Sequence, residues 1–97
     1  MNELQKEVDR VVKEFGGYWK PFEMLAALVE EIGELADEML AIEGVKKNYD
    51  RRRLEEELGD TMFALICIAN YYGIDLFDAL RSTIKKYRER DRERWTK

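Results

Sequence analysis

The sequence predicts an all-α protein of four helices that assembles as an intertwined dimeric helical bundle, and three observations lead to this prediction. Apolar residues recur at helical spacing through four segments, and none of them alternates as a strand does. Glycines and the single proline mark where these segments end or begin. One segment is apolar on every side, so burying it requires a second copy of the chain. All 97 residues are expected to form a single domain.

The first two helices are bounded by a glycine pair and by the proline. The first is expected over about residues 2–15, where Gly16 and Gly17 end it. Pro21 suits the first turn of the second helix, which Gly44 ends. This second helix carries a broad apolar stripe, formed by Leu25, Leu28, Val29, Ile32, Leu35, Ala36, Met39 and Leu40.

The other two helices follow a polar loop and begin at aspartates. Asp50 is expected to cap a third helix over about residues 51–72, which Gly73 ends. Asp75 is expected to cap the fourth, whose apolar positions are Leu76, Phe77, Leu80, Ile84 and Tyr87.

The third helix predicts the oligomeric state. Its residues 61–69 (TMFALICIA) carry no charge and are apolar all round, and such a helix must be buried on every side. Three other helices in a chain of 97 residues can hardly enclose it. We therefore expect a homodimer, or a pair of dimers forming a homotetramer, with the second and third helices of both subunits in the core.

The composition excludes several classes of function. There is no histidine, so zinc sites and catalysis by a histidine base are not expected. The single cysteine, Cys67, excludes an intramolecular disulfide and is interpreted as a core residue of a protein in a reducing compartment. No apolar run approaches the length of a membrane span, and the N-terminus is not a signal peptide, so a cytoplasmic protein without a membrane partner is expected.

Charge is distributed unevenly along the chain. Residues 81–97 hold eight Lys/Arg against three Asp/Glu, whereas the chain as a whole has a net charge of −4. A basic segment of this kind suits phosphate or nucleic acid. It equally suits a solvated helix end, which the helix dipole favours.

The acidic residues form two pairs at helical spacing beside apolar segments. Glu31 and Glu34 are three residues apart on the second helix, and Glu57 and Asp60 are three apart on the third. Crowded carboxylates at the rim of a core repel one another, which protonation, Lys/Arg partners or a divalent cation could relieve. An all-carboxylate site without histidine suits Mg²⁺, for which Mn²⁺ can substitute. The alternative is an acidic, solvated helix surface.

At these residues the sequence resembles the MazG-like nucleotide pyrophosphohydrolases of the all-α NTP pyrophosphatase superfamily. Their signature E-E-x-x-E, a spacer, then E-x-x-D is similar to Glu30-Glu31-Ile32-Gly33-Glu34 followed by Glu57-Leu58-Gly59-Asp60. The surrounding stretches LVEEIGELADE, EEELGDTMFALICIANYYGIDL and KKYRERDRERW also look like the family, and the resemblance covers about residues 18–95.

The resemblance implies Mg²⁺-dependent hydrolysis of a nucleoside triphosphate to the monophosphate and pyrophosphate, in the cleansing of nucleotide pools. It places the metal ligands on Glu31, Glu34, Glu57 and Asp60 and the phosphate-binding residues on Lys86 and Arg90. Either Glu30 or Glu34 could accept the proton of the attacking water.

Candidates for contact with the base are Trp19, Asn70 and Tyr71, although core packing, or a helix cap for Asn70, would also explain them. The preferred base is not fixed by the motif, and nucleic acid is not an expected partner.

Two other functions fit the same residues. One is a non-enzymatic helical dimerisation module whose basic C-terminal helix binds a partner. The other is a di-metal phosphohydrolase that acts on nucleoside monophosphates and releases inorganic phosphate.

Overall fold

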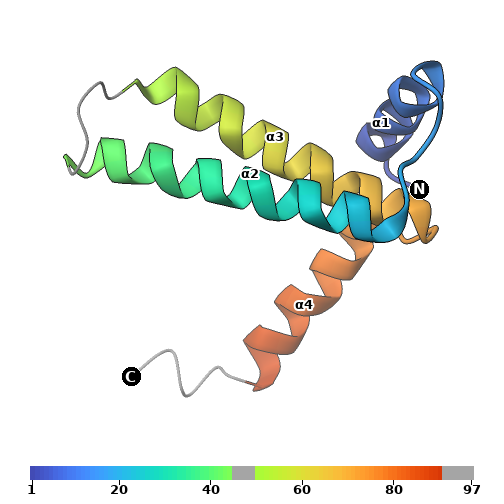
Figure 1. Ribbon diagram of the computed structural model, residues 1–97. Helices are drawn as coiled ribbons and strands as arrows, with labels where there is room; N and C mark the ends of the chain where they lie inside the picture. The colour runs from blue at the N-terminus through green and yellow to red at the C-terminus, as the bar shows by residue number, and fades with distance from the viewer. Residues whose placement is uncertain (45–49, 91–97) are drawn as a thin grey trace.

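The computed structural model describes residues 1–44 and 50–90, which form four α-helices and no strand (Figure 1). Most of the predicted polar loop (GVKKNYD, residues 44–50) and the end of the basic segment lie outside the described residues, which omit 45–49 and 91–97. The all-α prediction is confirmed, and the helices are α1 (Glu3–Glu14), α2 (Pro21–Ile42), α3 (Arg51–Tyr71) and α4 (Leu76–Arg90).

Local side-chain chemistry explains where the helices begin. The Asn2 side chain accepts a hydrogen bond from the Leu4 N–H (2.8 Å), which caps α1. Asp50 accepts from the Arg52 N–H (2.9 Å) at the start of α3. Asp75 accepts from two backbone N–H groups of the first turn of α4, at 3.1 and 3.0 Å. The two predicted aspartate caps are therefore confirmed.

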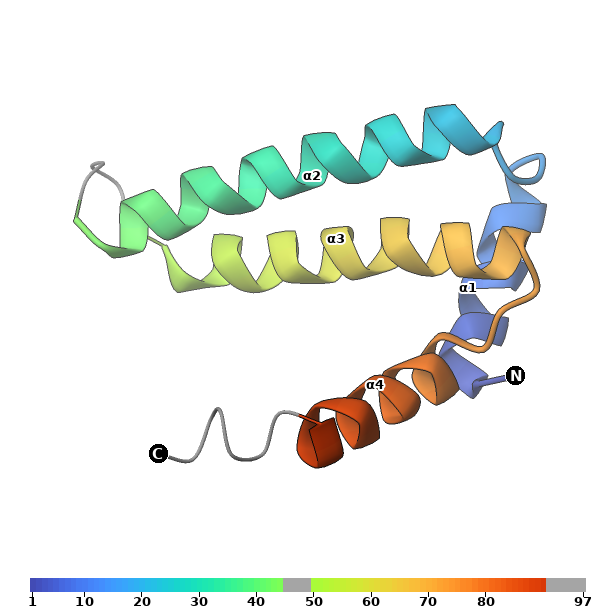
Figure 2. The ribbon, with the colours of Figure 1, turned by 90° about the horizontal axis from the view of Figure 1, so that it is seen from below.

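The two long helices lie side by side and antiparallel, and the two short helices attach to one end of this pair (Figures 1 and 2). α1 packs against the C-terminal part of α3. α4 leaves α3 at an angle of 102° and points away from the long pair. The acidic motifs of α2 and α3 therefore lie on helices that pack against each other.

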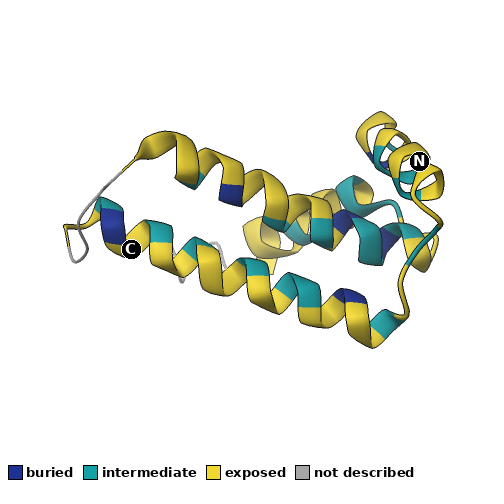
Figure 3. Ribbon diagram, turned by 45° about the horizontal axis from the view of Figure 1, so that its top comes forward, coloured by how far each residue is buried: buried dark blue, intermediate teal, exposed yellow. Residues whose placement is uncertain are grey.

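Little of the molecule is buried within a single chain (Figure 3). The buried apolar residues are Met24 and Ala41 of α2 and Ile66 and Ala69 of α3. In the apolar segment 61–69, three large side chains remain 40–43% exposed, those of Met62, Phe63 and Leu65. The described residues of a single chain therefore do not enclose its apolar segment 61–69.

Two further apolar surfaces stay exposed. The widest apolar stripe of α2 faces away from α3, and its exposed members are Leu25, Val29, Ile32, Met39 and Leu40. The second surface is the apolar stripe of α4, where Leu80, Ile84 and Tyr87 are 47–51% exposed. Exposed patches of this kind mark interaction surfaces.

Among the described residues, no single helix has the length and apolar character needed to cross a membrane. Only the bent pair of α3 and α4, taken together, meets that criterion of length and composition.

Candidate active site

Three carboxylates from the two long helices converge at one place. Glu31 of α2 and Glu57 and Asp60 of α3 each offer one oxygen, and these oxygens all lie within 4.8 Å of one another. Glu57 and Asp60 are neighbours because residues three apart share a helix face. Glu31 joins them because α3 packs on the side of α2 that carries Met24 and Ala41, and this side includes Glu31.

The cluster is unfavourable for negative charge. Glu57 is 8% exposed, and its Oε2 is buried without a hydrogen-bond partner among the described residues. Burial, followed by the neighbouring carboxyl groups of Glu31 and Glu34, raises the pKa of Glu57 to about 8. Contact with Glu57 acts to lower the pKa of Glu31, but Glu34, burial and the charge of Asp60 together outweigh it, so this pKa is raised as well.

Such a cluster fits a divalent cation. The donor set consists of carboxylate oxygens only, which hard ions such as Mg²⁺ and Mn²⁺ prefer. A cation would also give the buried Glu57 Oε2 the partner that no described residue provides. Repulsion among the carboxyl groups would become attraction to the ion, so the residues present fit a metal site.

The two acids proposed for proton transfer occupy different places. Glu34 is exposed but lies close enough to the cluster to perturb the pKa of both Glu31 and Glu57. Glu30 is exposed and is not one of the carboxylates that converge.

An apolar pocket of about 320 Å³ opens beside the carboxylates. Glu31 and Asp60 belong to its lining, and the rest of the wall comes from α1, the 15–20 segment, α2 and α3, through Val11, Val12, Phe15, Gly17, Tyr18, Trp19, Met24, Ala27, Phe63, Ala64 and Cys67. The volume falls in the range of small-molecule sites. The pocket thus joins an apolar space to an acidic rim.

The three candidates for base contact are separated by the fold. Trp19 lines the pocket, whereas Asn70 and Tyr71 do not. Asn70 instead exchanges hydrogen bonds with Gln5, donating to the Gln5 carbonyl oxygen (2.9 Å) and accepting from Gln5 Nε2 (3.0 Å). Tyr71 is 46% exposed and packs edge-to-face against Tyr72, with ring centroids 5.0 Å apart.

The basic candidates lie on α4, the helix that points away from the long pair of α2 and α3 (Figure 1). The Lys86 Nζ lies 5.0 Å and the Arg90 Cζ 5.8 Å from the centre of the Tyr87 ring, so both cations make a cation–π contact with the same side chain. Lys86 and Arg90 also line a shallow surface hollow with Ser82, Lys85 and Glu89. Neither belongs to the lining of the apolar pocket.

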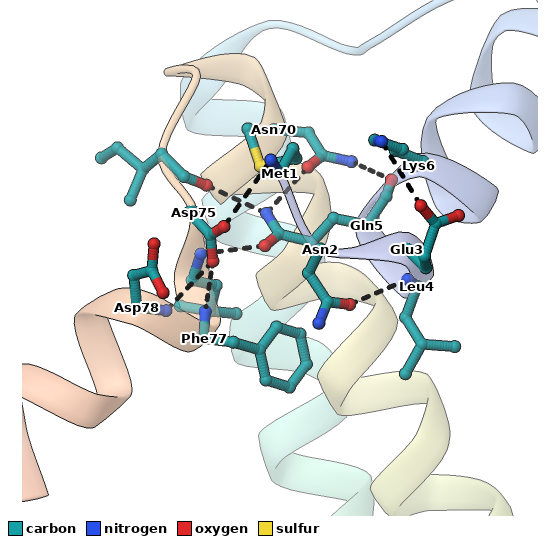
Figure 4. A network of polar contacts seen from close by, with 12 residues as sticks. Met1, Asn2, Glu3, Leu4, Gln5, Lys6, Asn70, Asp75, Phe77 and Asp78 are labelled. Atoms are coloured by element: carbon teal, nitrogen blue, oxygen red, sulfur yellow. Dashed lines mark hydrogen bonds and ion pairs between the residues drawn. The ribbon is translucent and has the colours of Figure 1, made fainter.

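Gln5 is a residue whose role the sequence did not indicate. It is fully buried where α1, the end of α3 and the start of α4 meet (Figure 4). Its Nε2 donates to the Ile74 carbonyl oxygen (2.9 Å), and its Oε1 accepts from the Leu76 N–H (2.9 Å). A lone glutamine in an amphipathic helix gives no sign of such a contact. The pocket-lining Tyr18 was also missed, although aromatic residues around Gly16 and Gly17 were a signal.

Comparisons with known proteins show the family to which this chain belongs. Residues 20–95 match the model of the MazG nucleotide pyrophosphohydrolase domain. The uncharacterized protein YpjD of Bacillus subtilis (strain 168) is 42% identical over 101 residues, which take in 100% of this chain and 91% of that protein. The nucleoside triphosphate pyrophosphohydrolase/pyrophosphatase MazG of Thermotoga maritima is 28% identical over 88 residues, 90% of this chain and 31% of that longer protein.

Two solved structures have the same arrangement of helices. The Bacillus-conserved MazG protein, described as a nucleotide pyrophosphohydrolase, matches with a TM-score of 0.79 and 42% identity over 94% of this chain and 92% of its own. The putative pyrophosphatase YpjD from Bacillus subtilis matches with a TM-score of 0.81 and 40% identity over 88% of this chain and 91% of its own. The chain, with its four helices and its converging carboxylates, therefore belongs to the MazG nucleotide pyrophosphohydrolase family.

Proposed function

We propose that this protein hydrolyses nucleoside triphosphates to nucleoside monophosphates and pyrophosphate, with Mg²⁺ or Mn²⁺ held by Glu31, Glu34, Glu57 and Asp60. The observation that carries this proposal is that the carboxylate cluster lies at the edge of the apolar pocket. Glu31 and Asp60 belong both to the carboxylate cluster and to the lining of the apolar pocket. A ligand with an apolar face at one end and phosphates at the other suits such a site.

The reaction places demands on the residues of this chain. The oxygen of a water molecule forms a bond to the α-phosphorus, the bond from that phosphorus to the α–β bridging oxygen breaks, and pyrophosphate leaves with that oxygen. The proton of the water passes to a carboxylate. Glu34 is better placed for this than Glu30 because it lies beside the cluster. A bound Mg²⁺ would supply positive charge against the phosphate oxygens.

The two ends of the substrate would be held by different elements. Trp19 offers an aromatic face for the base within the pocket. Lys86 and Arg90 lie one turn apart on α4 and suit the outer phosphates. Because α4 points away from the long helices that carry the carboxylates, this role favours delivery to the site of another subunit.

We further infer that the single domain of residues 1–97 works as a homodimer or homotetramer. The exposed apolar stripes of α2 and α4 and the exposed side chains of segment 61–69 are the support for this assembly. Each fully buried Leu, Ile or Phe contributes roughly 1.5–3 kcal/mol, so covering these surfaces with a second copy would be strongly favourable.

Product analysis in ¹⁸O-labelled water tests the proposal. A panel of nucleoside triphosphates is incubated with Mg²⁺ and the protein, and we expect pyrophosphate as the product, with the label in the monophosphate. Glu57→Gln should abolish most of the activity, while Glu56→Gln, the same change at the exposed neighbouring position, should retain it. Release of inorganic phosphate would favour a phosphohydrolase instead, and no product from any nucleotide would favour an interaction module.

A further inference from the structure

The segment that joins α1 to α2, residues 15–20, forms an outer wall of the pocket, and we call it the strap. The strap contributes Phe15, Gly17, Tyr18 and Trp19 to the pocket lining, to which α3 also contributes side chains. Phe15 is 83% exposed and Trp19 is 63% exposed, so burial of apolar surface contributes little to fixing the position of either side chain. Another interaction has to fix this wall relative to Glu31 and Asp60.

Backbone hydrogen bonds join the strap to α1 at Phe15, Gly16 and Gly17. Among the described residues, the last such tie is the hydrogen bond from the Gly17 N–H to the Val12 carbonyl oxygen (3.0 Å). Gly16 and Gly17 have φ of +105° and +101°, a region that glycine enters readily and other residues do not. The chain turns sharply here, and Tyr18 and Trp19 follow directly after the turn.

The next tie is made by a side chain. The Tyr18 hydroxyl donates a hydrogen bond to Asp9 Oδ1 of α1, with an O–O distance of 2.7 Å. Asp9 is itself held by the Lys13 ammonium group, which lies 2.9 Å from its Oδ2. α1 is anchored at its other end by the buried Gln5, so the acceptor for Tyr18 belongs to a fixed helix (Figure 4).

The ionisation of the two groups suits this bond at neutral pH. Burial, followed by the hydrogen bond to Asp9, raises the pKa of Tyr18 to about 12, so its hydroxyl keeps its proton. The hydrogen bonds from Tyr18 and Lys13 lower the pKa of Asp9, so its carboxylate stays an acceptor. Charge-assisted hydrogen bonds of this type are stronger than neutral ones.

We propose that Tyr18 is a positioning residue, which through its hydrogen bond to Asp9 holds the strap so that Trp19 forms the wall of the nucleotide pocket beside Glu31 and Asp60. The inference rests on the proposed function for the identity of the substrate. It does not depend on a metal, because the Tyr18–Asp9 bond lies outside the carboxylate cluster. Without this bond, the part of the strap between Gly17 and Lys20, whose N–H donates to Glu23 Oε1 of α2 (3.0 Å), would lose its tie to α1. Ordering this part each time a nucleotide binds would weaken binding.

Kinetics of Tyr18→Phe test this role, because the substitution removes the hydroxyl and keeps the ring. We expect KM for a nucleoside triphosphate to rise about threefold to tenfold, with kcat changed less than twofold. Asp9→Ala should give the same result, and the double variant should be no worse than either single one. Lys6→Met, which removes a cation of the same helix that pairs with Glu3 and not with Asp9, is the matched control and should leave KM within twofold of the parent value.

A spectroscopic measurement separates this inference from the proposed function. In a Trp95→Phe background Trp19 is the only tryptophan, so time-resolved fluorescence anisotropy reports its local motion. Tyr18→Phe and Asp9→Ala should both increase the amplitude of that motion in the protein without nucleotide. If the parent protein hydrolyses no nucleotide but both variants increase the motion of Trp19, the proposed hydrolase function is refuted and the positioning role of Tyr18 is still supported. Unchanged anisotropy in both variants, or a fall in kcat at constant KM, would overturn the positioning role.

Discussion

The carboxyl groups of Glu31 on α2 and Glu57 on α3 meet across the packed pair of long helices, each offering an oxygen within 4.8 Å of the other. Glu57 is the buried member, and burial together with the neighbouring carboxyl groups raises its pKa to about 8, so the site disfavours a further negative charge. The electrostatic cost of this contact, and its relief by a cation, underlies the first two predictions.

Glu57→Gln should stabilise the metal-free protein at neutral and alkaline pH. The pKa of Glu57 rises from its ordinary value of 4.5 to about 8 on folding, so its favourable contribution is complete below pH 4.5 and is lost as pH rises to 8. Glutamine does not titrate. In EDTA, the melting temperature of the variant minus that of the parent should therefore increase between pH 4.5 and pH 8, by about 4–8 °C for each 1 kcal/mol of stability that the parent loses. A difference between the two melting temperatures that stays constant with pH would contradict this.

Metal binding should release protons. At pH 7 Glu57 is mostly protonated, and a carboxylate must lose its proton to bind a cation. Isothermal titration with Mg²⁺ or Mn²⁺ in two buffers of different ionisation enthalpy should give different apparent enthalpies, and the affinity should increase from pH 6 to pH 8. Glu57→Gln is the control that should remove most of the buffer dependence.

The exposed stripe of α2 should be an interface between subunits. Ile32 is 50% exposed in the single chain, and Ile32→Glu would place a charge among apolar neighbours. Sedimentation at micromolar concentration should show a multimer for the parent and dissociation or unfolding for this variant. Arg10→Glu, at an exposed polar position of α1, should leave the assembly intact. A parent that sediments as a folded monomer would refute the assembly.

Lys86→Met should weaken the binding of nucleoside triphosphates. A charge-assisted contact to phosphate is worth about 1.5–3 kcal/mol, so KM should rise roughly tenfold or more. Arg88→Met removes the same charge from the same helix outside the hollow that Lys86 lines, and it should change KM less than twofold. Equal effects of the two substitutions would mean that only the net charge of α4 matters.

Trp19→Leu should weaken binding of the base and leave recognition of phosphate unchanged. Stacking of a base on an aromatic ring is worth about 1–3 kcal/mol, so KM for a nucleoside triphosphate should rise roughly fivefold to a hundredfold. Affinity for inorganic tripolyphosphate, which has no base, should not change. Tyr71→Leu tests the other aromatic candidate, and a larger effect there than at Trp19 would move the base away from the pocket.

The sequence by itself determined the helices, their ends and two of the three members of the carboxylate cluster, because these depend on residues close together in the chain. The caps at Asp50 and Asp75 bond to N–H groups two or three residues on. Glu57 and Asp60 share a face because a helix repeats every 3.6 residues. The apolar character of residues 61–69 is likewise visible without coordinates.

Only the tertiary structure decided which of these faces meet. Helix periodicity could not show that α3 packs on the side of α2 that carries Glu31 and leaves the wider apolar stripe exposed. Nor could it show that Asn70 is engaged by Gln5, a contact between residues 65 positions apart. Trp19 and Tyr18 became walls of one pocket because α1 folds back onto α3. Such contacts depend on how whole helices pack, and packing is decided by the summed burial and hydrogen bonding of the chain, whereas local spacing decides only the helices themselves.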